Sequence, residues 1–203
     1  PTASYTFSIG SWALAWSDEF DNLACSTQNP CSPDMTKWIF EVSSDTEVGM
    51  SHSDNNHYYK NRDAGWGTDR TENVRVENGT LVLETRNDNW QAHGVTSGRL
   101  RTAGGYSDVT VDPWVVKKQI QYGRLEARAK MDSGDGLWPA FWTAGVGPNI
   151  FPASGEIDIF EQPYWIRISN NMTSSIQSGT STEHIVTLMF SGDPSTVVPG
   201  SAA

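Results

Sequence analysis

Apolar and polar residues alternate along several stretches of the chain, whereas helical periodicity is hard to find. The clearest stretch is "VRVENGTLVLE" (74–84), in which two alternating runs flank Asn78-Gly79 and predict a hairpin with a type I′ turn. The longest is "QIQYGRLEARAKM" (119–131), which predicts a strand spanning a wide, curved sheet. In "GLWPAFWTAG" (136–145), Pro139 argues against a central strand. With no internal repeat or linker, this pattern predicts a single all-β domain over residues 1–203, built as an antiparallel sandwich.

The stretch "SGEIDIFEQP" (154–163) places three acids on an otherwise apolar run. Side chains on a strand alternate between its two faces, so Glu156 and Asp158 share one face while Glu161 has the wrong parity. A β-bulge at Ile159-Phe160 would add one residue and return Glu161 to the face of the other two acids. The alternative is an edge strand whose three acids are simply solvated, although three like charges on one face repel one another.

A bulged strand of this kind would suit glycoside hydrolysis, which needs two carboxyl groups beside the scissile bond. One carboxyl protonates the leaving oxygen, and the other attacks the anomeric carbon or activates a water that does. A separation of about 5–5.5 Å gives a retaining double displacement. The middle acid, Asp158, would raise the pKa of one neighbour and orient the other by a hydrogen bond.

Composition narrows the range of partners. The net charge of −10 over 203 residues argues against nucleic acid and anionic membrane surfaces as partners. Nine Trp suggest stacking platforms for sugars, with an aromatic core as the alternative. The two cysteines of "CSTQNPC" (25–31) are expected to form a small disulfide loop, which predicts a secreted protein; two free thiols are the alternative.

Six ordered blocks resemble glycoside hydrolase family 16, the laminarinase and lichenase clan. They are "WALAWSDEFD" (12–21), residues 55–86, "GRLRTAGG" (98–105), "QYGRLEARAKM" (121–131), "GLWPAFWTAG" and "GEIDIFE". The first resembles the family's N-terminal strand, and the last resembles its active-site signature in the bulged version typical of laminarinase-like members. The resemblance covers about residues 12–165 and implies a jelly-roll sandwich of two curved antiparallel sheets with the substrate on the concave face.

The resemblance also implies a function and a set of site residues. It implies a glycosidase: a retaining, endo-acting hydrolase of β-1,3- or mixed β-1,3(4)-glucans, monomeric and without a required cofactor. Glu156 is then the nucleophile, Glu161 the general acid/base and Asp158 their helper. Trp138 and Trp142 resemble sugar-stacking walls, with core packing as the alternative, and Glu19 resembles a residue that binds a structural calcium. The remaining substrate-binding positions are Asn56, Tyr58, Arg99 and Gln177, the last standing where the family has a histidine.

The chain departs from the family after the acidic stretch. The blocks that normally follow have no counterpart, and residues 180–203 form an atypical tail. The sandwich is therefore expected to be incomplete, with inner-face side chains lacking partners and with exposed sheet edges, and "TEHIVTLMFSG" (182–192) is expected to pair in place of a missing strand. The alternative functions are a glucan-binding protein with weak or no turnover, a galactan hydrolase of the agarose or carrageenan type, and a transglycosylase.

Overall fold

The computed structural model describes residues 12–40, 43–44, 57–59, 73–87, 94–103, 115–132, 134, 136–145, 151–162, 172–180 and 184–192. Every regular element among these residues is a strand, which agrees with the all-β prediction. The strands are β1 (Ile39–Phe40), β2 (Ser43–Ser44), β3 (His57–Tyr59), β4 (Val74–Glu77), β5 (Thr80–Leu83), β6 (Val95–Ser97), β7 (Leu100–Arg101), β8 (Ala140–Ala144), β9 (Glu156–Glu161), β10 (Met172–Gly179) and β11 (His184–Gly192). The described part of the chain contains no helix long and apolar enough to cross a membrane.

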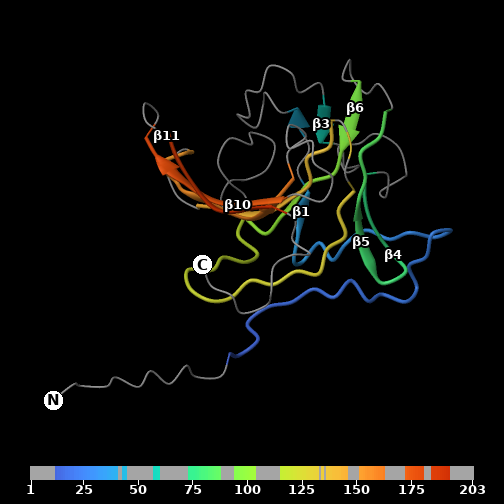
Figure 1. Ribbon diagram of the computed structural model, residues 1–203. Helices are drawn as coiled ribbons and strands as arrows, with labels where there is room; N and C mark the ends of the chain where they lie inside the picture. The colour runs from blue at the N-terminus through green and yellow to red at the C-terminus, as the bar shows by residue number, and fades with distance from the viewer. Residues whose placement is uncertain are drawn as a thin grey trace.

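The largest sheet has four antiparallel strands in the order β11-β10-β9-β8, and Figure 1 shows it as a curved layer at the C-terminal end of the colour scale. Strand β8 lies at one edge directly after Pro139, as the proline predicts, since an edge strand tolerates a residue without an amide hydrogen nearby. Strand β11 lies at the other edge, so the segment 184–192 does pair with the sheet as expected. The acidic strand β9 therefore has a hydrogen-bonded neighbour on each side.

The predicted hairpin is confirmed. Strands β4 and β5 pair antiparallel from Val74↔Leu83 to Glu77↔Thr80, and the green hairpin stands apart from the large sheet in Figure 1. Asn78 and Gly79 have φ angles of 51° and 73°, the two positive values that a type I′ turn requires. On strand β4, Val74 and Val76 are buried, so the alternation read from the sequence does mark the core-facing side.

The other strands form small sheets. Strand β1 pairs with β7, and β2, β3 and β6 form a sheet in which β3 and β6 run parallel. Ile39, Phe40, Val74, Val76 and Cys25 are the buried hydrophobic residues of the described chain. Among the described residues the strands thus fall into four sheets.

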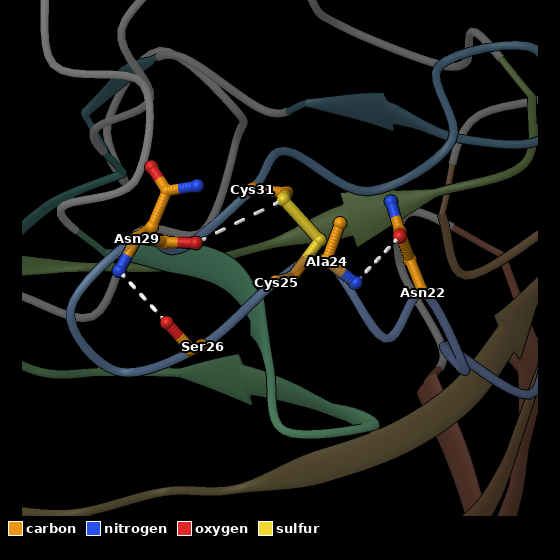
Figure 2. Close-up of a disulfide and its surroundings, with 6 residues drawn as sticks. All are labelled: Asn22, Ala24, Cys25, Ser26, Asn29 and Cys31. Atoms are coloured by element: carbon orange, nitrogen blue, oxygen red, sulfur yellow. Dashed lines mark hydrogen bonds between the residues drawn. A yellow bond between two sulfur atoms is a disulfide. The ribbon is translucent and has the colours of Figure 1, made fainter.

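The disulfide between Cys25 and Cys31 closes the predicted loop, with the two Cα atoms 5.4 Å apart (Figure 2). Inside the loop, the backbone amides and carbonyls of Ser26 and Asn29 bond each other, and the Ser26 hydroxyl accepts from the Asn29 amide. Cys31 forms a two-way backbone bridge with Val76, which ties the loop to strand β4. The cross-link therefore fixes a turn against the hairpin.

Two predicted strands are wrong. Residues 119–131 form no strand and are almost entirely exposed, with Tyr122 at 89% exposure and Ile120 at 48%. A strand needs a neighbour to receive its backbone hydrogen bonds, and no described strand lies beside this segment. Residues 12–21, which resemble the family's N-terminal strand, are likewise irregular.

The tryptophans divide between packing and exposure. Trp38 contacts Trp16 edge-on and Phe20 in a stacked arrangement, while its Nε1 donates to Asp18 Oδ2 at 2.7 Å. Trp12, in contrast, is 63% exposed. Part of the tryptophan surplus therefore serves local packing, with the indole N–H satisfied as its burial requires.

Candidate active site

The entry into strand β9 depends on two glycines. The amide of Gly145, at the end of β8, donates to the carbonyl of Gly155 at 2.9 Å. A Cβ atom on Gly145 would lie 1.8 Å from the Ser154 carbonyl oxygen, so only glycine fits this approach. Gly155 has a φ of 77°, again a conformation that favours glycine. The two glycines thus set the point where the acidic strand begins, directly at Glu156.

Strand β9 carries the predicted bulge. Against β8, Phe160 pairs with Phe141 but Asp158 pairs with Trp142, so Ile159 has no partner. Against β10, Glu161 pairs with Thr173 and Asp158 with Ser175, so Ile159 and Phe160 together lie opposite Ser174 alone. Both neighbours therefore show one extra residue in β9 within Ile159-Phe160, where the parity of Glu161 required it.

The bulge places the three acids on one face. Glu156, Asp158 and Glu161 lie opposite residues 144, 142 and 140 of β8, and opposite residues 177, 175 and 173 of β10. These partners are alternate residues of regular strands, so each set of three shares a face. Since β9 lies inside the sheet, the alternative of a solvated edge strand is wrong.

Asp158 is the fixed centre of the group. It is 1% exposed, and its Oδ2 accepts a hydrogen bond from the Ser175 hydroxyl and another from Gln177 Nε2 at 2.8 Å. The Ser174 hydroxyl donates to the Asp158 backbone carbonyl at 2.8 Å. A buried carboxyl needs such partners, and all of these donors come from strand β10.

The two glutamates are held on opposite sides of Asp158. Glu156 Oε1 accepts from Gln177 Nε2 at 2.6 Å, and Glu161 Oε1 accepts from Trp138 Nε1 at 2.9 Å. Burial, followed by the charges of Asp158 and Glu161, raises the pKa of Glu156 to about 8, while Arg99 acts in the opposite direction. Burial and Asp158 also raise the pKa of Glu161, against the hydrogen bond from Trp138. The site therefore retains protons at a pH where ordinary carboxyls are ionised.

Arg99 and the two predicted cleft tryptophans adjoin the acids. The Arg99 guanidinium lies over the ring of Trp142, 4.8 Å from its centroid, and Trp142 pairs with Asp158 in the sheet. Trp138 is bound to Glu161 through its N–H, so its indole orientation is tied to that carboxyl. Both tryptophans are partly exposed rather than part of the buried core. Their arrangement leaves aromatic surface beside the acids.

The structure gives different outcomes for the other predicted site residues. Asn56 lies outside the described residues, and Tyr58 is placed only as part of the backbone of β3. Gln177 bonds two of the acids directly, a contact that the sequence did not predict.

Among the described residues no group of three or more His, Cys, Asp or Glu could hold a metal ion, and Glu19 belongs to no such group. The calcium at Glu19 thus stays a prediction without structural support.

Sequence reasoning missed Ser174 and Ser175. Both bond Asp158, one at its backbone and one at its carboxylate, yet they stand in a polar stretch with no chemical signature. The signal that could have found them is register, because Ser175 lies directly opposite Asp158 once β10 is paired with β9. That pairing could not be read from one sequence.

Comparison with known proteins agrees with this geometry. Residues 125–192 match the family model described as "XgeA-like, catalytic GH16 domain". A β-glucanase of Rhodothermus marinus is 34% identical over 155 residues, covering 74% of this chain and 43% of that protein. A β-1,3-glucan-binding protein of Penaeus monodon is 46% identical over 69 residues, covering 33% of this chain and 16% of that protein.

A solved structure extends the likeness to the fold. The laminarinase catalytic domain of Thermotoga maritima superposes with a TM-score of 0.64 at 29% identity, covering 93% of this chain and 65% of that domain. The described strands therefore share the jelly-roll fold of that domain. The chain spans less than half the length of the curated relatives it matches, as the coverage of the R. marinus protein illustrates.

Proposed function

We propose that the chain is a glycosidase of glycoside hydrolase family 16 that cleaves β-1,3- or mixed β-1,3(4)-glucans with retention of configuration and by endo attack. The observation that carries the proposal is the bulge at Ile159, which places three carboxyl groups on one face of an internal strand. The two outer carboxyls have different hydrogen-bond partners, as two different chemical roles require.

In the first step, the Glu156 carboxylate attacks the anomeric carbon while the Glu161 carboxylic acid protonates the departing glycosidic oxygen. The carbon–oxygen bond to the leaving sugar breaks, and an ester between the sugar and Glu156 forms. In the second step, the Glu161 carboxylate removes a proton from water, the water oxygen attacks the same carbon, and Glu156 leaves as a carboxylate. Each step inverts the anomeric carbon, so the product keeps the configuration of the substrate.

The electrostatics of the site keep a proton on the pair of glutamates, because burial raises the pKa of both, that of Glu156 to about 8. The mechanism, and not the pKa shift, assigns that proton to Glu161. A general acid must keep its proton near neutral pH, and burial and the charge of Asp158 shift the pKa of Glu161 in that direction. Glu156 must lose its proton to attack. Burial and the charges of Asp158 and Glu161 oppose this by raising its pKa, while the positive charge of Arg99 favours the ionised form. Because the three carboxyls interact, their titration belongs to the group rather than to single residues. The active form has one proton, on Glu161.

We propose that Trp138, Trp142 and Arg99 contact the sugar on either side of the cleaved bond. Arg99 and Trp142 lie together, and the partly exposed ring of Trp142 can pack against the apolar face of a pyranose. Asn56 and Tyr58 are further proposed contacts on the strength of the family resemblance. Neutral glucans suit this acidic chain better than sulfated galactans, because its net charge of −10 would repel a polyanion.

The decisive experiment measures reducing-sugar release from laminarin, lichenan and agarose by the wild-type protein and by Glu156→Ser. We expect release from the two glucans, with a loss of about 10⁴-fold or more in the variant because the nucleophile is gone. Ile157→Thr is the matched control, since Ile157 is the next residue of the same strand and is exposed on its other face. Equal release by the wild type and Glu156→Ser would refute the assignment. Short oligosaccharides early in the reaction would support endo attack.

A second candidate is a glucan-binding protein with little turnover. The likeness to the P. monodon glucan-binding protein over 69 residues favours it. Affinity electrophoresis in gels containing laminarin separates the two functions. Retardation without sugar release at any pH between 5 and 9 would favour binding alone.

We also propose that the protein is secreted and monomeric. The Cys25–Cys31 disulfide supports secretion, because such cross-links persist in oxidising compartments. Light scattering after size exclusion tests the oligomeric state, and a mass of 22.4 kDa is expected for the monomer. Addition of calcium or a chelator should change the melting temperature only if the site at Glu19 exists.

A further inference from the structure

Gln177 spans two of the three acids through a single nitrogen atom. Its Nε2 lies 2.6 Å from Glu156 Oε1 and 2.8 Å from Asp158 Oδ2. The contact is built into the fold, because Gln177 pairs directly with Glu156 in the β9–β10 ladder. The family resemblance places a histidine at this position, where this chain has a glutamine.

The chemistry of the amide makes this contact selective for carboxylates. The NH2 group has two hydrogens to donate and accepts none, so it matches two carboxylate oxygens at once. The opposite orientation of the amide would place its oxygen, which can only accept hydrogen bonds, against the carboxylate oxygens of both acids. A hydrogen bond to the charged form favours that form, so Gln177 opposes the effect of burial on Glu156.

We propose that Gln177 is a positioning residue that tethers the Glu156 carboxylate to Asp158 and presents it, ionised, for attack on the anomeric carbon. The inference rests on the proposed function, which it deepens by naming what orients the nucleophile. Ser175 has a narrower role, since its hydroxyl bonds Asp158. Strand β10 thus anchors Asp158 with one side chain and ties Glu156 to that anchor with another.

The charged groups around Glu156 set what Gln177 can contribute. Asp158 and Glu161 lie on the same strand and Arg99 acts from outside the sheet. The residues paired with the two acids on β8, Ala144 and Trp142, carry no charge, and Ser175 and Gln177 on β10 do not titrate near neutral pH. Gln177 therefore supplies hydrogen bonds without adding a group that titrates near neutral pH. The histidine that the family resemblance gives this position would add one.

The test compares Gln177→Leu, which removes both donors at similar volume, with Gln177→Glu, which keeps the shape but adds a charge. Ser178→Ala is the matched control, because Ser178 follows in the same strand and is exposed. The acidic limb of the kcat/KM pH profile should move to higher pH by about one pH unit in Gln177→Leu, and further in Gln177→Glu. At pH 6 this shift corresponds to roughly a tenfold lower kcat/KM, and the difference from the wild type disappears as the pH rises. A purely structural role would lower activity equally at every pH.

A second readout does not depend on turnover. Carbon-13 NMR of the glutamate carboxyls follows the titration of Glu156, assigned by its absence in Glu156→Gln. We expect the Glu156 midpoint to rise in both Gln177 variants and to stay unchanged in Ser178→Ala. A shifted midpoint in a protein that releases no sugar would refute the proposed function and leave the tether standing. An unchanged midpoint and an unchanged pH profile in an active protein would refute the tether.

Discussion

Residues 119–131 and strand β9 both contain alternating apolar and polar residues, and they differ in what lies beside them. Strand β9 has β8 on one side and β10 on the other, and both ladders hold through its bulge. Residues 119–131 have no strand beside them in the described chain, and Ile120, Tyr122 and Leu125 are exposed. Alternation of apolar and polar residues thus indicates which face a strand would bury, whereas the strand itself forms only where a neighbouring strand pairs with it.

The same contrast appears between the two faces of β9. On the acid-bearing face, Glu156, Asp158 and Glu161 each have a hydrogen-bond partner. On the other face, Ile157 is 48% exposed and Ile176 of β10 is 39% exposed. Each acid of the site therefore has a hydrogen-bond partner, while these two isoleucines on the opposite face of the sheet stay exposed.

The largest expected effect comes from changing the bulge. Inserting one alanine after Ile159 reverses the parity of Glu161 and turns it to the far face, so activity on laminarin should fall by about 10³-fold or more. Deleting Ile159 removes the bulge but leaves Glu156, Asp158 and the last glutamate at alternate positions, so part of the activity should remain. Steady-state kinetics of both variants checks this prediction. Equal losses in the insertion and the deletion would contradict the parity argument.

The next effect concerns protection of the backbone. Amides of β9 are hydrogen-bonded within a four-stranded sheet, so they should exchange with solvent about 10³-fold or more slowly than those of residues 119–131. Hydrogen exchange followed by mass spectrometry of peptides covering both segments gives the comparison. Equal protection would mean that 119–131 has a strand partner in solution.

The third effect is a pH dependence of stability. The pKa of Glu156 is about 8 in the folded protein and 4.5, its ordinary value, in the unfolded chain. The folded state thus binds the proton more tightly, so the free energy of unfolding falls as the pH rises from about 4.5 to about 8. Glu156→Gln removes the part of this dependence that comes from Glu156 and should raise the free energy of unfolding at pH 9 by about 1–3 kcal/mol, a range reduced for the partial exposure of the carboxyl. Urea unfolding at pH 5 and pH 9 measures it. A wild-type protein that is more stable at pH 9 would contradict the raised pKa.

The smallest effect should come from the exposed segment. Tyr122→Ser removes a side chain that is 89% exposed, so the free energy of unfolding should change by no more than about 0.5 kcal/mol. Val74→Ala is the comparison, because Val74 is fully buried and its truncation should cost about 1–3 kcal/mol. Urea unfolding of the two variants side by side would show whether Tyr122 has a partner.

The sequence allowed accurate prediction wherever the cause was local. The Asn78-Gly79 turn needs two positive φ angles, the edge position of β8 follows from Pro139, and the bulge follows from the spacing of Glu156, Asp158 and Glu161. Long-range pairing was harder to predict. The partner strand β10, with Ser175 and Gln177 on its acid-facing side, could not be predicted from a polar stretch. The residues 119–131 alternate as a strand does, and nothing in them indicates that no strand of the described chain pairs with them.

The central claim is that Glu156 and Glu161 act together on one face of β9 as nucleophile and acid/base. Proton NMR of laminarin hydrolysis at the earliest times tests it most directly, by the anomeric configuration of the newly formed reducing end. The proposed double displacement predicts that the β-anomer appears first and then equilibrates. First appearance of the α-anomer would show an inverting reaction and would contradict the roles assigned to both glutamates.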